Sequence, residues 1–356
     1  MVEGRRPLSW ASVDVLDLAG LALVAAAIGW TLAAAAASGG SPIPVVSLLA
    51  ASAVSLTVGR VASSRVRWAA PAIVLAAALA LFLASPGATL SGSPLYGPFG
   101  YANAAGAFFV QAAVAGLMVA VSVRSTGGRA LGVAAAIVFG LVPFAKSSLA
   151  AASLVAVLPA LALTARGGKA VRLVIATCGA LFVLVLASTI VLGATFTGGP
   201  RVGAVDRVVD RTLSERRVAL WHDALEIMNE EPVTGVGPGR FQVTSPTAVG
   251  DADARWAHDE FLQQGAEGGL VGFGLLLALF LWGFVRLRAT PGPDIVTALG
   301  AVALAALGIH ASVDYVLHFP AVPIAAAALV GTAQAPRKMD DPSLGAEKDA
   351  LELAGP

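Results

Sequence analysis

The sequence has few charged residues and a single cysteine. Only 13% of its 356 residues are charged, whereas a soluble domain carries about 25%. The lone Cys178 excludes a disulfide within the chain. The apolar runs lack the period-two alternation of a membrane β-barrel, and no basic cluster indicates a nucleic-acid partner. These absences leave helical membrane proteins as the class to test.

Apolar runs long enough to cross a bilayer core of about 30 Å recur along the chain. They predict an all-α polytopic membrane protein with about ten transmembrane helices. The expected spans are 15–37, 45–61, 69–84, 104–123, 130–144, 147–164, 171–194, 268–285, 295–313 and 321–333. The first run exceeds a signal-peptide core, so we expect an uncleaved helix. The two spans around Lys146 have a re-entrant hairpin as their alternative.

Basic residues are concentrated in every second loop between the expected spans. The positive-inside rule therefore predicts cytoplasmic termini and one long extracytoplasmic loop. We expect four parts: an N-terminal bundle of about seven helices (1–194), the extracytoplasmic catalytic loop (195–267), about three C-terminal helices (268–334) and a disordered cytoplasmic tail (335–356).

The loop 195–267 differs from the rest of the chain, because it holds 12 of the 22 acidic residues and two of the four histidines. Apolar residues recur at helical spacing over 205–228, and charged residues, Asp223 among them, occupy the opposite positions. They predict an amphipathic helix, on the membrane surface or over the bundle, whose end is limited by Pro232. The run 235–239 (GVGPG) lacks the Lys-Ser/Thr ending of a phosphate-binding loop and is interpreted as a turn.

Three residues stand out as candidates for chemistry. His258, just before an expected span, could accept a proton from a hydroxyl at neutral pH; its alternative is an interfacial histidine that caps a helix. Arg217 has the planar fork that suits phosphate oxygens, with a solvated helix face as the alternative. Lys146 is the one basic residue within 131–165, which makes it a functional candidate unless it extends to the outer interface.

Asp314 lies between two histidines in the segment GIHASVDYVLHFPA and could orient a histidine or hold an arginine. A metal site from His310, Asp314 and His318 is the alternative, since positions i, i+4 and i+8 share a helix face. No other ligand cluster is evident, so we expect neither a metal nor a cofactor. Asn103 is a polar group that needs a partner in a membrane helix.

Several stretches together resemble one family. They are Arg217 with Trp221 (R-x-x-x-W), EPVTGVGPGRF (231–241, which contains Arg240), AHDEFLQQGAEGGLVGF (257–273), GPFGYANAAGAFF (97–109) and HASVDYVLHFPA (310–321). Their order resembles that of the O-antigen ligase and polymerase family, which are bacterial membrane glycosyltransferases. The family commonly has about twelve spans, two more than expected here.

The resemblance implies an activity and its substrates. The donor is a glycan linked through pyrophosphate to a polyprenyl lipid, at the outer face of the bacterial cytoplasmic membrane. The acceptor is a hydroxyl on a glycan, a lipid or a protein, and polyprenyl pyrophosphate is released. Ligases and polymerases share this donor, so the sequence does not separate them.

The resemblance also implies roles for individual residues. His258 matches the family's general base, and Arg217 matches an arginine that holds the pyrophosphate. Lys146 stands where the family often has arginine, and keeps the charge without the fork. Arg240, Asp314 and Asn103 are expected to bind substrate. Fixed cations facing the departing pyrophosphate would stabilise the transition state without a metal.

Two other classes remain as alternatives. A secondary transporter or exporter of envelope glycans or lipids could use Lys146 and Asp314 as substrate or proton sites. Such proteins often contain inverted repeats, and no repeat between the halves is visible here. A non-catalytic partner in an envelope complex is the third class, and the presence of His258 and Arg217 argues against it.

Overall fold

The chain folds into helices at almost every expected span. The computed structural model describes residues 14–84, 99–147, 150–151, 153, 167–196, 214–251 and 254–335. Its elements are α1 (Val15–Ser38), α2 (Ile43–Arg65), α3 (Ala69–Ala84), α5 (Ala102–Ser122), α6 (Thr126–Lys146), α8 (Gly168–Ala194), α10 (Glu215–Glu230), α11 (Phe241–Thr244), α12 (Glu260–Arg288), α13 (Ile295–Ala311), the 3-10 turn η2 (Val316–His318) and α14 (Ala321–Gln334). No strand occurs in these ranges, which confirms the all-α class.

Among the described segments, five helices are long and apolar enough to cross a membrane: α1, α2, α5, α8 and α12. Shorter apolar helices lie at α3, α6, α13 and α14. The multi-pass class is therefore supported, whereas the number of ten spans stays a prediction. The expected span 147–164 lies mostly outside the described residues, as do the expected tail and residues 205–213 of the expected amphipathic helix.

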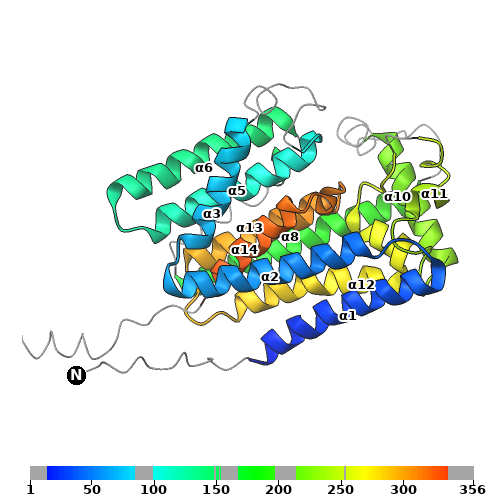
Figure 1. Cartoon of the computed structure of the whole chain (residues 1–356), viewed down its shortest axis with the longest axis horizontal. Coiled ribbons are helices and arrows are strands. Elements are labelled where there is room, and N and C mark those ends of the chain that lie inside the picture. Colours follow the sequence, from blue (N-terminus) through cyan, green and yellow to red (C-terminus); the bar gives the residue numbers. More distant parts are fainter. Residues whose placement is uncertain are drawn as a thin grey trace, which may run out of the picture.

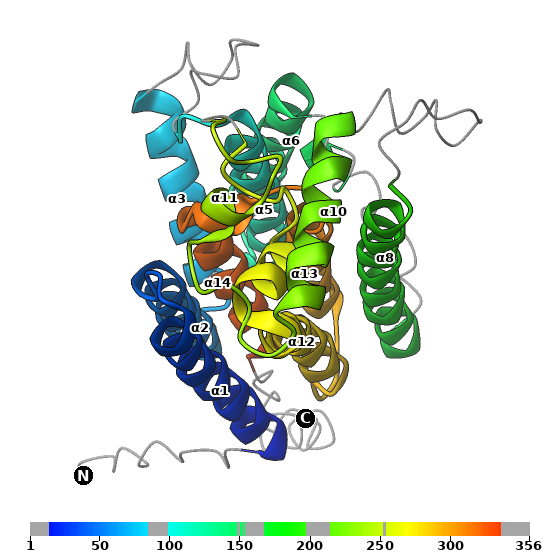
Figure 2. The same ribbon diagram turned by 90° about the vertical axis from the view of Figure 1, so that its right-hand side faces the viewer.

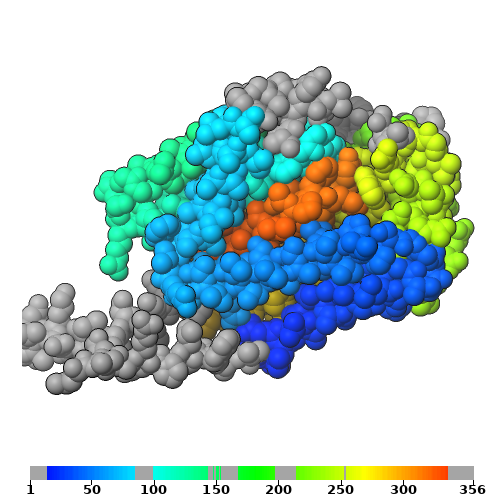
Figure 3. Space-filling view, viewed as in Figure 1, coloured from blue at the N-terminus to red at the C-terminus, as the bar shows by residue number. Residues whose placement is uncertain are grey.

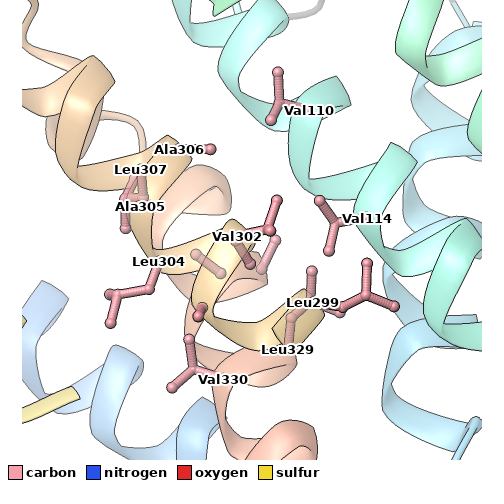
Figure 4. Packing of buried hydrophobic residues seen from close by; sticks show 14 of the residues in the cluster. Val110, Val114, Leu299, Val302, Leu304, Ala305, Ala306, Leu307, Leu329 and Val330 are labelled. Carbon is pink, nitrogen blue, oxygen red and sulfur yellow. The ribbon is translucent and has the colours of Figure 1, made fainter. Parts of the chain in front are cut away.

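The core of the bundle lies where α5, α13 and α14 meet. Figure 4 shows valines of α5 facing the apolar side chains of α13 and α14. All of α13 except its first residue is buried, as expected for a helix that is apolar on every side. On the face drawn in Figure 3, the orange surface of α14 lies above α2 and next to α3.

Glycines bring neighbouring helices into close contact. A Cβ added at Gly116 of α5 would lie 2.7 Å from the backbone nitrogen of Ala136 in α6, and one at Gly132 would lie 2.6 Å from that of Ala120. Small residues serve this purpose in membrane helices, where apolar surface alone does not drive helices together. These two glycines fix how closely α5 and α6 pack.

Two tryptophans attach α1 to α12. The indole nitrogen of Trp30 donates to the carbonyl of Gly268, and that of Trp282 donates to the carbonyl of Leu16, both at 2.7 Å. Between α1, α2, α12, α13 and α14 lies a mostly apolar cavity of about 460 Å³, with Glu260 and His318 among its polar lining residues.

Helix α12 begins earlier than expected and is broken by a glycine. The predicted span starts at 268, but the helix starts at Glu260, because the side chain of Asp259 accepts hydrogen bonds from the backbone of Phe261 and Leu262. Gly269 has φ +67° and interrupts the helix. The backbone nitrogen of the next residue donates to the carbonyl of Pro232 at 2.9 Å. The predicted catalytic loop therefore ends in a helical segment.

We expect Gly269→Ala to destabilise the protein. An added Cβ would lie 2.1 Å from the carbonyl oxygen of Val233, and the positive φ is unfavourable for alanine. Strain of this kind costs about 1–3 kcal/mol, so thermal unfolding in detergent should begin at a lower temperature. Gly274→Ala is the matched control, since that glycine of α12 has open space around it. Equal melting temperatures for the two variants would contradict the steric argument.

The described part of the polar loop between α8 and α12, from residue 214 onward, covers one end of the bundle. In Figures 1 and 2, α10 and α11 lie across that end, with α8 on one side and α1 and α2 on the other. Helix α10 buries the apolar face predicted for the amphipathic helix. One expectation is wrong: Asp223, expected on the polar face, is buried. Ser245 Oγ and the backbone nitrogen of Thr247 donate to its carboxylate, because the segment 241–251 folds over this side of α10.

Candidate active site

One buried carboxylate joins the two residues that the sequence marks for chemistry. Asp314 follows the end of α13 and its side chain is fully buried. His258 Nδ1 lies 3.2 Å from Asp314 Oδ1, and Arg217 Nη2 lies 3.2 Å from Asp314 Oδ2. Arg217 also donates from Nη1 to the carbonyl of Val313 at 3.3 Å. Asp314 therefore contacts both a histidine and an arginine, the two kinds of partner that the sequence suggests for it.

Two side chains at the start of α5 complete the shell around Asp314. The hydroxyl of Tyr101 lies 2.8 Å from both carboxylate oxygens. Asn103 donates from Nδ2 to the same carboxylate and, at 3.0 Å, to the Tyr101 hydroxyl. The backbone nitrogen of Tyr315 donates to Oδ1 at 2.8 Å. Residues from four separate stretches of sequence therefore meet at one point.

The backbone of His258 is held in an unusual conformation. It is the only residue other than glycine with positive φ (54°) among those the structure describes. Trp221 Nε1 donates to the His258 carbonyl at 3.1 Å, and Asp259, the next residue, is fixed as the N-cap of α12 and by a 2.7 Å hydrogen bond from Thr189. Such conformations persist where the surrounding structure enforces them, and they gather at functional sites.

The electrostatics keep Asp314 charged and Tyr101 neutral. Burial alone would raise the pKa of Asp314, but the hydrogen bond from His258 and the positive charge of Arg217 outweigh it and hold the pKa below its usual range. Burial and the neighbouring Asp314 charge raise the pKa of Tyr101 well above its usual range, so its hydroxyl remains a donor. Asp314 is therefore a fixed anion between the His258 imidazole and the Arg217 guanidinium.

The contacts with Asp314 determine which roles are open to the His258 imidazole and the Arg217 guanidinium. An anionic Asp314 accepts a hydrogen bond from Nδ1–H of His258, a tautomer inferred from the partner, which leaves Nε2 as the proton acceptor. The side chain of His258 is 13% exposed and that of Arg217 is 17% exposed, so both reach the surface of the site. A guanidinium has five N–H groups, and the contacts of Nη1 and Nη2 leave others for a ligand. The site can hold an anion and take up a proton.

Comparison with protein families identifies the domain that contains most of this site. Residues 102–277 match the family model described as O-antigen ligase. Over this range, just under half of its length, the chain is similar to the O-antigen ligase family. A search of curated proteins gives no match. The match confirms the resemblance seen in the sequence and supports glycan transfer of the ligase or polymerase type. Asp314 lies outside the matched range, although it contacts Arg217 and His258 within it.

Two other cations, Lys146 and Arg240, are expected at this site, and the structure places neither side chain against Asp314 among the described residues. The side chain of Lys146, the last residue of α6, is outside the described residues. Its neighbour Ser147 lies against Gly106, since a Cβ added there would be 2.9 Å from the Ser147 Cβ; Gly106 is one turn after Asn103. Arg240 donates from Nη1 to the carbonyl of Ser38 at 2.7 Å, at the end of α1. Its role in substrate binding stays a prediction.

The GVGPG turn (235–239) and the residues after it bind the carboxylate of Glu267. The backbone nitrogens of Gly239 and Phe241 donate to Glu267 at 2.8 and 3.2 Å, and Gly237 donates to the Glu267 carbonyl at 3.0 Å. The turn also contacts the end of α1, because Ser41 donates to the carbonyl of Pro238 at 2.9 Å. The GVGPG run therefore connects α12 to the α1–α2 turn.

The histidines near Asp314 do not share one helix face, as the metal alternative required. Helix α13 ends at Ala311, and the separate turn η2 carries His318, whose Nδ1 lies 3.1 Å from Glu260. Within the described ranges, no three His, Cys, Asp or Glu side chains are grouped so as to hold a metal ion.

The sequence reasoning missed two tyrosines of the site. Tyr101 binds Asp314, and Tyr315 lies edge-on to His258, with ring centroids 4.8 Å apart. Both stand inside stretches that carry the family resemblance, beside Asn103 and Asp314. A tyrosine in an apolar segment resembles other core residues by its hydropathy, although its hydroxyl needs a partner when buried.

Proposed function

We propose that this chain is a glycosyltransferase that moves a glycan from a polyprenyl pyrophosphate to an acceptor hydroxyl. The observation that carries the proposal is the contact of one buried carboxylate, Asp314, with both a histidine and an arginine. The reaction needs a base for the hydroxyl and a cation for the departing pyrophosphate. The O-antigen ligase family match supports the same chemistry.

In the proposed reaction, His258 acts as the general base. The acceptor oxygen forms a bond to the anomeric carbon of the donor sugar, and its proton passes to Nε2 of His258. The bond between the anomeric carbon and the pyrophosphate oxygen breaks, and its electron pair leaves with polyprenyl pyrophosphate. Asp314 stabilises the imidazolium that forms, since it is an anion at 3.2 Å from Nδ1. A positioned base of this kind contributes about 10²–10⁴-fold to a rate.

Arg217 is proposed to hold the pyrophosphate, with Lys146 as a second cation. Charge that develops on the leaving oxygens is stabilised by fixed donors that need no rearrangement during the reaction. Lys146 is proposed from the sequence and from its place at the end of α6, beside the turn of α5 that follows Asn103. The proposed reaction uses no metal.

We further propose that the covered end of the bundle faces the outside of the cytoplasmic membrane. The basic loops of the sequence support this orientation, with both termini inside. The segment 214–258 and the groups around Asp314 would then meet a donor in the outer leaflet.

A transfer assay tests the proposed function. The purified protein, in lipid nanodiscs and with a chelator, should convert a polyprenyl-pyrophosphate-linked glycan and an acceptor into a longer glycan and free polyprenyl pyrophosphate. No turnover across several donors and acceptors would count against the proposal. Movement of intact donor across liposome membranes, without its consumption, would instead indicate the transporter alternative.

We expect Arg217→Lys to impair use of the donor. Lysine keeps the charge but loses the planar fork that binds two phosphate oxygens together. A lost hydrogen bond to a charged group is worth about 1.5–3 kcal/mol, so kcat/KM for the donor should fall about 10- to 100-fold. Arg216→Lys is the matched control, because Arg216 pairs with the exposed Asp251 instead. Equal donor kinetics for both variants would refute the phosphate role.

A further inference from the structure

Aromatic rings gather around Tyr315, whose ring contacts that of His258. The residues are Tyr101, Trp256, Tyr315, His318 and Phe319, from three separate stretches of the chain. Four of these rings are half-buried, and the side chain of His318 is 29% exposed. The proposed reaction uses Tyr101 to position Asp314 and leaves the other four rings without a role.

Tyr315 joins two groups of rings, Tyr101 with Phe319 and Trp256 with His318. Tyr101 stacks on Tyr315 with ring centroids 4.6 Å apart and on Phe319 at 5.5 Å. Trp256 packs on His318 at 4.0 Å and lies 6.3 Å from Tyr315. Tyr101 stacks on one face of Tyr315, and the His258 ring is nearly perpendicular to Tyr315, with ring centroids 4.8 Å apart. Trp256 and His318 therefore both lie near Tyr315, and Tyr315 is the ring that contacts the proposed base.

The carboxylate of Glu260 lies next to the pair of rings formed by Trp256 and His318. Glu260 Oε1 lies 3.1 Å from Nδ1 of His318 and accepts a 2.7 Å hydrogen bond from the backbone nitrogen of Leu317. The Glu260 side chain is 7% exposed, so this pair is held in place. The result is a half-buried ring surface with fixed hydrogen-bonding groups at its border.

This combination fits one kind of ligand. A pyranose ring has faces rich in C–H groups, which pack on the electron-rich face of an aromatic ring, and a rim of hydroxyls that bind carboxylate and imidazole. A prenyl chain needs no polar border, and a phosphate would be repelled by Glu260. Sites for small molecules typically combine aromatic walls with a few polar groups in this way.

We propose that Trp256, Tyr315 and His318 form a subsite that binds the sugar ring of the acceptor. The inference rests on the proposed function, since it places the ring beside a base that must reach the attacking hydroxyl. That hydroxyl has to come within about 3 Å of Nε2, and Tyr315 lies against the His258 ring. Of the three acceptor classes the sequence allows, this selects a glycan over a protein or a simple lipid hydroxyl.

Direct binding tests the subsite independently of turnover. In saturation-transfer NMR with the full chain in nanodiscs, methyl pyranosides of common hexoses should receive saturation at their ring C–H protons. Mannitol, an open-chain polyol with hydroxyls but no ring face, should not. Trp256→Ala should remove most of the sugar signal, and Trp256→Phe should keep it, because phenylalanine retains an aromatic face. Trp68→Ala is the control, since Trp68 is a half-exposed indole between α2 and α3.

A kinetic measurement then assigns the sugar to the acceptor. Trp256→Ala should raise KM for the acceptor about tenfold, the effect of an aromatic contact of about 1.4 kcal/mol. The values of kcat and of KM for the donor should stay within about twofold. Equal signals for sugar and mannitol, a signal kept in Trp256→Ala, or a change in donor KM alone would each overturn the inference. Sugar binding that depends on Trp256, in a protein with no transfer, would support the subsite and reject the proposed function.

Discussion

Replacing His258 should abolish glycan transfer while the protein stays folded and inserted in the membrane. In the proposed reaction Asp314 cannot take the acceptor proton in place of His258, because it is fully buried and its oxygens are engaged. Loss of a positioned base lowers a rate by about 10²–10⁴-fold. The rate should fall in kcat, with KM for the donor changed little, because Arg217 remains.

The choice of variant matters at this position. His258 has φ 54°, a conformation that asparagine tolerates better than alanine does. His258→Asn therefore removes the base with less change to the backbone, and its melting temperature should stay close to that of the wild type. His222→Asn is the control, because His222 of α10 contacts Glu226 and the carbonyl of Gly193. Transfer at the wild-type rate in His258→Asn would exclude this histidine as the base.

The sequence predicts most of the helices and suggests His258, Arg217 and Asp314 as candidates, but it does not indicate how these residues meet. His258, Arg217 and Tyr101 are 56, 97 and 213 positions from Asp314. Hydropathy reports each helix by itself and carries no information on which helices are neighbours. The contacts of Asp314 depend on where α5 and α10 begin relative to the end of α13, which is a property of the packed bundle.

Other features depend on contacts that leave no local pattern. Gly269 stands among other glycines in a helical stretch, and the backbone of Val233, 36 positions earlier, leaves no room for a side chain there. Asp223 fits the polar face of an amphipathic helix by spacing, yet the segment 241–251 covers it. Spacing predicts which face of a helix is apolar, and it cannot indicate what covers the opposite face.

Asp314→Asn is expected to impair both the deprotonation of the acceptor by His258 and the binding of the donor pyrophosphate by Arg217. An amide cannot accept from His258, Arg217 and Tyr101 at once, and it leaves the guanidinium without its anion. We therefore expect kcat to fall about 10²–10⁴-fold, as on loss of the base itself, and donor KM to rise as well. Breaking a buried ion pair also costs about 3–5 kcal/mol, so the melting temperature should fall, unlike in His258→Asn.

The pH dependence of this stability term follows from the lowered pKa of Asp314. A carboxylate with a depressed pKa stabilises the fold fully above its unfolded pKa of about 3.9, and the stabilisation is lost as the pH falls through the folded value. The stability difference between wild type and Asp314→Asn should thus be constant from about pH 5 to 8 and shrink only in stronger acid. Asp251→Asn, which removes the exposed partner of Arg216, is the control and should change neither stability nor transfer.

A double variant distinguishes a shared role from two separate ones. If Asp314 acts in catalysis through His258, the kcat of His258→Asn/Asp314→Asn should be close to that of His258→Asn alone, because the second change has no base left to orient. Independent roles would multiply the two losses, since effects of uncoupled sites add in free energy. Donor KM should still rise in the double variant, because Asp314 also holds Arg217. Multiplied losses in kcat would contradict the assignment of Asp314 as the residue that orients the base.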